Sequence, residues 1–371
     1  MTTNIRNFVS ASAIAALATL SFLAAPTFAA AEPGYSHDAN LYIPQPAWMS
    51  TLPDSMKMSY MSLPGTHDSM ARFGGDSVQT QVMDLQTQLM AGIRVLDIRI
   101  LFEANTFDLC RGIIPQPGNF DTVMQTVSNF LQQYPRETVF MRIKDETNGL
   151  LNTMTFEEVF SVYHSRYSYV FWNNTHPESK AGPVNPTLGE LRGKVVVLQD
   201  FTASQSYGLA YNSLNAQDNY NLTTNWDLYN KWTNVKDQLA LANLVGQLCL
   251  PGISCMTLLP GNENKLYINY LSGATGVFPY FVASGKSDPS TSGPLLPTGK
   301  TTPGWNSWPD FPRTNCLGSL CTIAFEGTNN LTFNWLAAGG KKRVGIIMAD
   351  FPGIGLISQV IALNRNAGAG F

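Results

Sequence analysis

The chain has 371 residues, of which 44% are hydrophobic and 13% are charged, and its formal net charge is −3. A chain of this length forms one large domain or two small ones, and this apolar content fills a sizeable core. The weakly acidic balance and the lack of a polybasic run exclude nucleic acid as a principal partner, and also exclude strong electrostatic attraction to anionic lipid.

The first 31 residues are predicted to be a secretory signal peptide. Arg6 is their only charge, an apolar run covers residues 13–25, and small residues at 29–31 offer a cleavage site before Glu32. The apolar run is too short for a membrane span, and no later segment is long enough for one. We therefore expect a soluble, secreted mature chain, residues 32–371, without a transmembrane segment and with a net charge of −4.

Strand-like and helix-like runs alternate along the mature chain. Apolar runs typical of strands cover residues 58–63, 93–100, 138–143, 194–198, 266–270 and 343–348. Helical spacing covers residues 77–90, 120–133, 156–163, 235–248 and 353–364. The predicted N-caps are Asp76 or Ser77 for the first helix and Thr155 for the third. Residues 284–315 are rich in Ser, Pro, Gly and Thr, which predicts a long loop.

This order of elements sets the expected fold class. Alternation of strands and helices indicates a parallel sheet. Strands that end on polar residues along the whole chain favour a single irregular (β/α)8 TIM-type barrel over an open sheet. The sequence contains no dinucleotide-binding glycine fingerprint and no P-loop.

Two segments carry the clearest functional signal. Residues 63–69 read LPGTHDS and residues 92–99 read GIRVLDIR, so each is a short apolar run that stops on ionisable residues. Barrel strands have this form where their carboxyl ends carry chemistry. His67 is one of 4 histidines in the chain, and by itself it fits a hydrogen-bonded loop residue equally well. The second segment favours a site, because Asp97 and Arg99 would converge on the same mouth.

The five cysteines predict two local disulfides in an oxidising compartment. The close pairs are Cys249–Cys255 and Cys316–Cys321, and Cys110 is left over. No cysteine or histidine spacing indicates a zinc site.

Six segments in order resemble the X-domain of the bacterial phosphatidylinositol-specific phospholipases C. They are PGTHD at 64–68, GIRVLDIR at 92–99, ETVFMRIK at 137–144, LGELRGK at 188–194, QDNY at 217–220 and VGIIMADFP at 344–352. The resemblance runs from about residue 62 to residue 364, which is nearly the whole mature chain. It implies a TIM-type barrel that acts as a phosphatidylinositol diacylglycerol-lyase without a cofactor. In that reaction the inositol 2-hydroxyl attacks the phosphodiester, diacylglycerol leaves, and inositol 1,2-cyclic phosphate forms.

The resemblance also implies catalytic roles. His67 takes the position of the general base, a task for which imidazole is suited because it titrates near neutral pH. Asp350 takes the position of its partner, as in a hydrolase triad, although it also fits an N-cap of the last helix. Arg99 takes the position of the cation that meets charge on the non-bridging oxygens, although it also fits an ion pair with Asp97 or Asp68. Asp68 stands where calcium-dependent relatives keep an asparagine ligand, and because Arg99 would repel calcium there we predict no metal.

The resemblance assigns four residues to the inositol ring. Lys144, Arg192 and Asp218 would bind its hydroxyl groups, and Tyr220 would lie flat against its face. Without the resemblance, Lys144 fits a solvated strand end and Arg192 fits a helix C-cap before Gly193.

One position departs from the family pattern. The general acid of the family is a histidine directly before a glycine, and here Arg111 precedes Gly112. Arginine is a poor proton donor because its pKa exceeds about 12, and loss of a general acid typically costs about 10²–10⁴ in rate. Arg111 can still stabilise the leaving alkoxide electrostatically. Cys110 is a poor substitute acid, and neither His164 nor His176 lies in a motif that would replace the missing one.

Three functional readings remain open from the sequence. The first is a secreted, catalytically impaired phosphatidylinositol-cleaving enzyme that meets its lipid at a membrane surface. The second is a protein that binds inositol phosphates or phosphoinositide headgroups without turnover, because Arg111 replaces the acid. The third is a metal-dependent glycerophosphodiesterase, which Arg99 disfavours. Trp305 and Trp308 could insert into a membrane, but packing near the Cys316–Cys321 pair is slightly favoured.

Overall fold

The computed structural model describes residues 33–146, 151–173, 185–244, 246–248, 256–258, 264–290 and 293–367. These described residues belong to one compact unit. The predicted signal peptide and the predicted Cys249–Cys255 disulfide lie outside the described residues, as does His176. In the described part of the chain, no helix combines the length and apolarity needed to cross a membrane.

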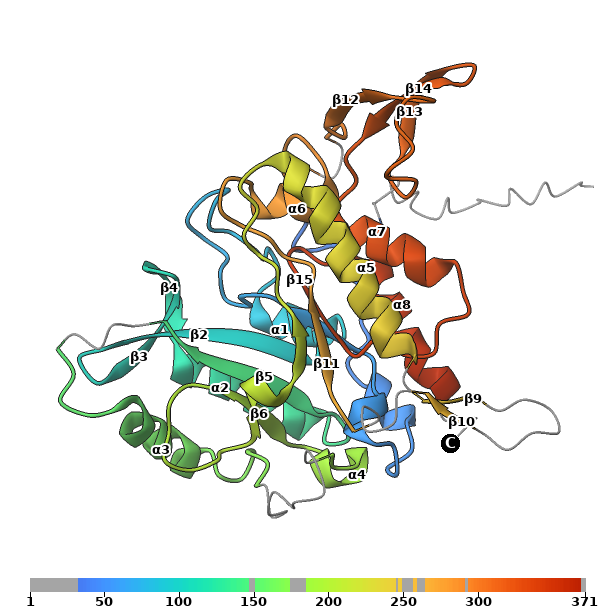
Figure 1. The fold of residues 1–371 in the computed structure, drawn as a ribbon. Helices are drawn as coiled ribbons and strands as arrows, with labels where there is room; N and C mark the ends of the chain where they lie inside the picture. Colours follow the sequence, from blue (N-terminus) through green and yellow to red (C-terminus); the bar gives the residue numbers. More distant parts are fainter. Residues whose placement is uncertain are drawn as a thin grey trace, which may run out of the picture. The chain divides into compact units, whose positions relative to one another are not determined.

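A curled sheet of eight parallel strands forms the centre of this unit (Figure 1). Around the sheet the strands are β8 (Asn215–Gln217), β11 (Tyr267–Tyr270), β15 (Ile346–Ala349), β1 (Leu63–Thr66), β2 (Val95–Glu103), β5 (Val139–Asp145), β6 (Val195–Asp200) and β7 (Leu209–Ala210). Among the described residues, β7 and β8 form its two unpaired edges. The expected irregular (β/α) barrel is therefore confirmed, and the carboxyl ends of its strands share one rim.

Strand β1 requires close approach of its neighbours on both sides. All four of its residues are buried. A Cβ atom on Gly65 would lie 2.5 Å from Sδ of Met348 in β15 and 2.9 Å from Cβ of Val95 in β2. Only glycine leaves room for three strands at this level. Gly65 of the PGTHD motif thus allows the close strand packing that places His67 and Asp68 at the rim.

An antiparallel hairpin extends the sheet beyond the expected second strand. Strand β2 continues to Glu103, β3 (Thr106–Arg111) turns back along it, and β4 (Ile114–Asn119) pairs with β3. The sequence analysis did not predict β3 or β4. Because β3 runs opposite to β2, its last residue, Arg111, returns to the barrel rim.

Helices flank the sheet (Figure 1). They are α1 (Leu85–Met90), α2 (Phe120–Gln133), α3 (Phe156–Arg166), α4 (Leu188–Leu191), α5 (Leu228–Leu244), α6 (Pro279–Ser284), α7 (Thr328–Ala337) and α8 (Ile354–Ala367). The helix predicted over residues 120–133 is confirmed at both ends. Thr155 caps α3, as predicted, in a reciprocal capping box with Glu158.

Two predicted helices differ from the structure. The first begins at Leu85 rather than at residue 77, because Asp84 and not Asp76 or Ser77 accepts the capping hydrogen bond, from the amide of Thr87. Helix α5 begins earlier than predicted and ends at residue 244, after which residues 246–248 form strand β9 instead of helix. Strand β9 pairs antiparallel with β10 (Met256–Leu258).

A three-stranded antiparallel sheet replaces part of the predicted long loop. Within residues 284–315, β12 (Pro297–Thr301) and the start of β13 (Arg313–Leu317) are strands, and both pair with β14 (Leu320–Ala324). The Cys316–Cys321 disulfide joins β13 to β14, as predicted, and Cys110 is a buried free thiol. The Gly- and Pro-rich composition of this segment hid β12, whose pairing partner β14 lies about twenty residues further along the chain.

Trp305 and Trp308 pack against the protein core. The Trp308 ring stacks on Tyr229 at a centroid distance of 4.7 Å, and the Trp305 ring lies 5.8 Å from the same tyrosine. Both belong to the margin of one cluster of buried apolar residues. Of the two readings of these tryptophans, the structure shows packing and gives no support to membrane insertion.

Candidate active site

The ends of β1 and β15 bring His67 and Asp350 together. Thr66 and Ala349, the last residues of these parallel strands, are directly paired, so the residues that follow lie at the same level. Nδ1 of His67 lies 2.7 Å from Oδ1 of Asp350, whose side chain is fully buried. The predicted partnership of these two residues therefore has a direct contact.

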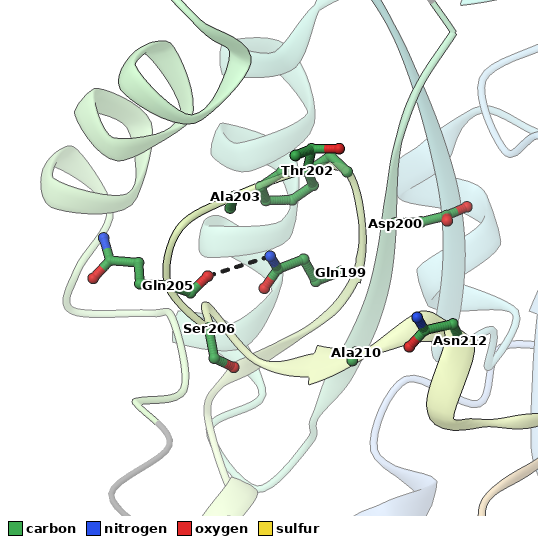
Figure 2. A pocket seen from close by; sticks show the side chains of 9 residues that line it. Gln199, Asp200, Thr202, Ala203, Gln205, Ser206, Ala210 and Asn212 are labelled. Carbon is green, nitrogen blue, oxygen red and sulfur yellow. Dashed lines mark hydrogen bonds between the residues drawn. The ribbon is translucent and has the colours of Figure 1, made fainter.

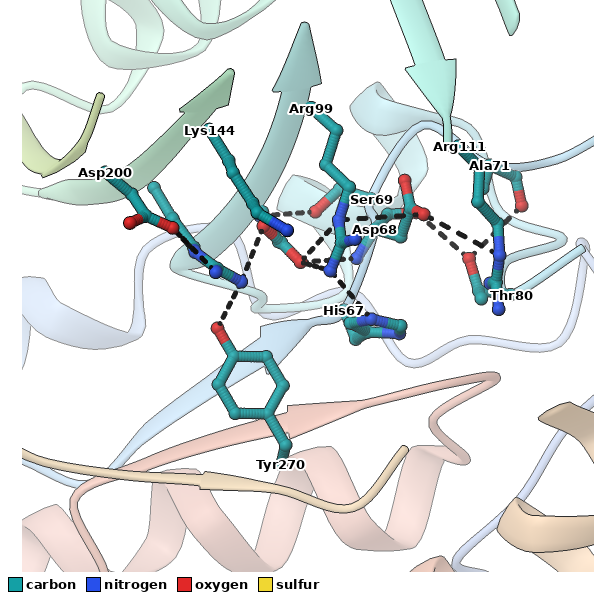
Figure 3. Close-up of polar contacts among 12 residues, drawn as sticks. His67, Asp68, Ser69, Ala71, Thr80, Arg99, Arg111, Lys144, Asp200 and Tyr270 are labelled. Carbon is teal, nitrogen blue, oxygen red and sulfur yellow. Dashed lines mark hydrogen bonds and ion pairs between the residues drawn. The ribbon is translucent and has the colours of Figure 1, made fainter. Parts of the chain in front are cut away.

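Arg99 contacts the second ring nitrogen of His67 (Figure 3). Alternation along β2 places Asp97 and Arg99 on the same face of the sheet. Nη2 of Arg99 is 3.0 Å from Nε2 of His67 and 3.2 Å from Oδ2 of Asp97, and Nη1 is 2.8 Å from Oε1 of Glu146. Arg99 is thus held by carboxylates from β2 and from the end of β5, which fixes its guanidinium beside the imidazole.

Two buried aspartates behind Arg99 have pKa values shifted in opposite directions. Burial disfavours the charged form of Asp97 and tends to raise its pKa. The guanidinium groups of Arg99 and Arg142 outweigh this effect and hold the pKa of Asp97 below its usual range. Burial raises the pKa of Asp68 to about 6, against the opposing effect of Arg99. Asp68 adopts a φ of 45°, and its Oδ2 lies 3.7 Å from Nε of Arg99 and 3.9 Å from Nε of Arg111. Asp68 therefore links the two arginines.

Arg111 reaches the same pocket from the β3–β4 hairpin. Its Nη1 is buried and has no hydrogen-bond partner among the described residues. An arginine nitrogen buried in this way is suited to an anionic ligand, since leaving it unpaired is costly. Cys110, the residue before Arg111, is buried, and burial raises the pKa of its thiol to about 12. The thiol is therefore an unsuitable proton donor at neutral pH.

The end of β5 contributes both a predicted and an unpredicted cation. Nζ of Lys144 pairs with Glu146 at 2.8 Å. Two residues earlier on the same face, Nη1 of Arg142 donates to the hydroxyl of Tyr270 at 2.9 Å, and Nη2 pairs with Asp200 at 2.7 Å. The sequence analysis missed Arg142, Glu146 and Tyr270. Arg142 was detectable, because period-two alternation from Lys144 places it on the inward face.

These side chains surround a cavity of about 450 Å³ at the carboxyl ends of the strands. Asp218 and Tyr220, which follow β8, complete the wall, and the Tyr220 side chain is 55% exposed. The residues that line the cavity are His67, Ser77, Val78, Arg99, Arg111, Gly112, Arg142, Lys144, Glu146, Asp218, Tyr220, Ser272, Gly273, Ala274 and Thr275. The cavity is polar and mixed in charge, which suits a phosphorylated polyol more than an apolar ligand.

Arg192 does not lie at this cavity, so its assignment to the inositol ring is wrong. It follows α4 and precedes β6, and its guanidinium binds Oδ1 of Asp54 at 3.0 Å and the carbonyl oxygens of Met49 and Leu52 at 2.7 and 2.8 Å. The amino end of a barrel strand is opposite the end that carries the cavity. Arg192 therefore lies at the opposite end of the barrel, where it binds the segment that contains Met49, Leu52 and Asp54.

Comparison with known proteins finds similarity to one family. The family model described as "PI-PLC X 1" matches residues 55–234. A 1-phosphatidylinositol phosphodiesterase of Listeria monocytogenes is 34% identical over 191 residues, which cover 47% of this chain and 57% of the relative. One of Staphylococcus aureus strain Newman is 25% identical over 289 residues, or 71% of this chain and 90% of the relative. The chain is therefore similar to the phosphatidylinositol-specific phospholipases C, with an X-domain match over residues 55–234.

Solved structures of the family share the fold. The phosphatidylinositol-specific phospholipase C from Listeria monocytogenes aligns with a TM-score of 0.60 and 23% identity, covering 86% of this chain and 99% of that one. A structure of the Staphylococcus aureus phosphatidylinositol-specific phospholipase C aligns with a TM-score of 0.58 and 23% identity, covering 86% of this chain and 98% of that one. By sequence, the chain spans little more than half the length of the Listeria relative. The match supports the X-domain barrel as its architecture.

In this X-domain barrel, the described residues include no group of three or more His, Cys, Asp or Glu side chains arranged to hold a metal ion. Asp350 binds the His67 ring, and the neighbouring carboxylate of Asp97 faces guanidinium groups. Asp97 contacts both Arg99 and Arg142, at 3.2 and 3.4 Å. Arginine side chains therefore place positive charge at this rim.

A second cavity of the X-domain lies inside the loop after β6 (Figure 2). Its polar side chains mostly bind the loop itself. Gln199 donates to the carbonyl of Gln205 at 3.3 Å and accepts from the amide of Tyr207 at 2.9 Å, and Ser206 donates to the carbonyl of Gly208. These bonds account for the loop conformation, so the first cavity is the candidate active site.

Proposed function

We propose that this chain cleaves phosphatidylinositol as a phospholipase C, releasing diacylglycerol and inositol 1,2-cyclic phosphate. The observation that carries the proposal is the position of His67 between Asp350 and Arg99 at the wall of a polar cavity. A reaction that begins with attack by a hydroxyl group needs a base and a fixed cation within reach of one phosphodiester. The X-domain match over residues 55–234 and the names of the relatives support the same reaction class.

The contacts of the His67 ring assign its tautomer. Arg99 can only donate hydrogen bonds, so Nε2 of His67, 3.0 Å from Nη2 of Arg99, is the acceptor. Nδ1 then carries the proton and donates it to Asp350 at 2.7 Å. A general base needs this arrangement, with its lone pair at Nε2 and a carboxylate ready to stabilise the imidazolium.

The proposed first step follows from this arrangement. The 2-hydroxyl of the inositol ring takes the place of the Arg99 N–H at Nε2 of His67 and gives its proton to that nitrogen. The hydroxyl oxygen forms a bond to phosphorus, and the bond from phosphorus to the diacylglycerol oxygen breaks. Arg99, released from the ring nitrogen, meets the charge on the non-bridging oxygens. The departing oxygen still requires a proton.

The inositol ring is assigned to the opposite part of the cavity. Lys144 and Asp218 offer a donor and an acceptor for its hydroxyl groups, and the half-exposed Tyr220 offers an aromatic face. Arg142 takes the place that the sequence analysis gave to Arg192, because it lines the cavity and lies behind Lys144 on the same strand.

Arg111 is the reason for a second candidate function. It lines the cavity where the family has its proton donor, and it cannot protonate a leaving alkoxide efficiently. Its buried Nη1, without a partner among the described residues, suits retention of a bound phosphate. A protein that binds inositol phosphates or phosphoinositide headgroups without turnover is therefore the alternative to an enzyme.

Substitution of Arg111 by histidine separates these two functions. We expect R111H to release inositol 1,2-cyclic phosphate from phosphatidylinositol micelles about 10²-fold faster than the parent, or more, because it restores a general acid. The measurement is the initial rate of cyclic phosphate release by both proteins. Equal rates would contradict the idea that Arg111 impairs the parent, and would show that Arg111 or another group stabilises or protonates the leaving oxygen. An inactive parent beside an active variant would favour the binding protein.

The hairpin beside the cavity is proposed to meet the membrane. Ile113, next to the cavity residue Gly112, is 87% exposed, and Ile114 is 38% exposed. The half-exposed Phe73 is held beside them, because its backbone amide and carbonyl both bind the Gln116 side chain of β4, at 3.0 and 2.9 Å. Apolar side chains at the mouth of a cavity for a lipid headgroup are positioned to enter the acyl boundary.

The Ile113→Asp substitution tests this surface. We expect I113D to bind vesicles of phosphatidylcholine and phosphatidylinositol at least about tenfold more weakly, since an isoleucine side chain gains roughly 1.5–3 kcal/mol on leaving water. Leu317→Asp is the matched control, because Leu317 is 82% exposed on the distant β13–β14 hairpin. Vesicle sedimentation measures both. Equal loss in the two variants would argue against a specific role of the β3–β4 hairpin.

Secretion is part of the same proposal. The N-terminal residues have the composition of a signal peptide. The Cys316–Cys321 disulfide is of the kind that persists in oxidising compartments. An exported enzyme of this type would meet inositol lipids outside the cell that makes it.

A further inference from the structure

Lys231 is a buried cation close to the cavity, although the sequence analysis did not single it out. It lies in α5, and its side chain is completely buried. Among the described residues no carboxylate oxygen lies within ion-pair distance of its Nζ. Lysine is almost never fully buried without such a partner. A buried ammonium group at a position that an apolar side chain could fill requires an explanation.

The ammonium group of Lys231 connects the ends of two cavity strands. Nζ donates to the carbonyl oxygen of Tyr270 at the end of β11 at 2.7 Å, and lies 3.5 Å from Oε1 of Gln217 at the end of β8. The same Gln217 oxygen accepts from the amide of Asn219 at 2.7 Å. Lys231 therefore lies directly beneath the turn that carries Asp218.

Both strand ends lead to residues of the candidate active site. Asp218 follows Gln217 and lines the cavity, and Tyr220 lies two residues further on. On the other strand, the Tyr270 hydroxyl accepts from Arg142, and its ring lies edge-on to His67 at a centroid distance of 5.9 Å. Movement at the Lys231 contacts would be passed to both the ring-binding and the catalytic walls.

The charges that face Lys231 are carboxylates of the site itself. Asp218, from the turn after β8, and Asp350, from the end of β15, are the groups whose charge favours its protonated form. The remaining contacts, from β11 and β8, are the neutral Tyr270 carbonyl and Gln217 amide. Burial outweighs these carboxylates and lowers the pKa of Lys231 to about 7.

We propose that Lys231 is a positioning residue of the candidate active site, whose ammonium group ties β8 to β11 and so holds Asp218 and Tyr220 for the inositol ring. The proposal rests on the proposed function, in that it assumes an inositol ring in this cavity. It goes beyond that function by assigning a role to a residue that touches no substrate. An apolar side chain at position 231 would fill the same volume without a buried charge. The ammonium group of Lys231 therefore lowers the stability of the fold, and we attribute its presence to its role at the site.

The Lys231→Met substitution separates positioning from a structural role. Methionine has a similar length and no charge, so we expect K231M to unfold at a higher temperature than the parent at pH 6–7. The folded-state pKa of Lys231 lies below its unfolded value of 10.5. Between about pH 7 and pH 10 the unfolded state therefore binds more protons, and the stability of the parent rises with pH. The advantage of K231M should shrink over that range.

Binding of free myo-inositol is the decisive measurement, because it does not depend on turnover. At pH 6 we expect K231M to bind myo-inositol about tenfold more weakly than the parent, while its thermal stability is equal or higher. Arg343→Met is the matched control, since Arg343 is a buried cation that binds backbone carbonyls of Ser59 and Ala242, away from the cavity. R343M should bind myo-inositol as the parent does.

The pH dependence of the parent gives a second test that needs no variant to fold. Its affinity for myo-inositol should fall between pH 6 and pH 9 as Lys231 loses its proton, and K231M, where it folds, should show a smaller change. His67 also faces the cavity and is present in both proteins, so the difference between them reports Lys231. Unchanged affinity in K231M, or a flat profile in the parent, would overturn the proposal. Failure of cyclic phosphate release would instead count against the proposed function.

Discussion

Replacement of His67 by glutamine is expected to lower the rate of cyclic phosphate release by about 10²–10⁴-fold, because the reaction loses its general base. The glutamine amide can still donate to Oδ1 of Asp350, which is fully buried and would otherwise lose its partner. It has no basic nitrogen and cannot accept the proton of the inositol 2-hydroxyl. The initial rate at saturating phosphatidylinositol measures the effect, in the R111H background if the parent is too slow.

A second histidine provides the matched control for this substitution. His164 lies in α3, where its ring stacks on Phe171 at 4.9 Å, outside the cavity. We expect H164Q to keep the rate of the parent, so that any large loss in H67Q reports the position of the imidazole and not the loss of a histidine as such. A rate for H67Q within tenfold of its background protein would contradict the assignment of His67 as the base.

The parts of the site that were predictable from the sequence are those that lie at strand ends. His67, Asp350 and Arg99 each end an apolar run, and parallel strands necessarily bring their carboxyl ends to one rim. The contacts of His67 with both partners follow from that rule together with the register of β1 and β15. Local pattern and global topology agree at these positions, so the sequence is informative there.

Arg192 shows where this reasoning fails. It lies in a segment that resembles the family, but it precedes its strand, and the amino end of a strand faces away from the cavity. Similarity of a segment places an element in the fold and does not by itself place each side chain at the site. Arg142 is the opposite case: it lines the cavity but was not predicted to. It lies within the same strand as Lys144, between apolar residues, so the sequence pattern did not single it out.

The β3–β4 hairpin could not be predicted for a different reason. Its second strand contains two prolines and a glycine, residues that single-sequence patterns assign to loops. Among the strands that the structure describes, β4 pairs with β3 alone, and such an edge position tolerates proline. Its pairing depends on β2 and β3, not on its own composition, and so the residue it helps to position, Arg111, could be found only by the family motif.

Replacement of Arg99 by lysine is expected to lower the maximal rate of cyclic phosphate release by about 10²–10³-fold, the effect of removing one preorganised donor from a developing charge. Arg99 is held at once by Asp97 and Glu146, at 3.2 and 2.8 Å, while Nη2 lies 3.0 Å from His67. Lysine keeps the charge that the buried carboxylates require, so the fold should survive. It lacks the planar fork that contacts a phosphate and these carboxylates together.

Arg94 supplies the control that makes the result specific. It precedes the same strand at its amino end and forms a buried two-point contact with Glu137, at 2.9 and 2.7 Å. R94K disturbs an equivalent arginine–carboxylate pair far from the cavity, so we expect lower thermal stability with a maximal rate close to that of the parent. If R99K and R94K lost activity equally, the loss would reflect damage to the barrel. If R99K kept the parent rate, Arg99 would not be the cation that meets the phosphate, and the proposed mechanism would have to place that charge on Arg111 or Arg142.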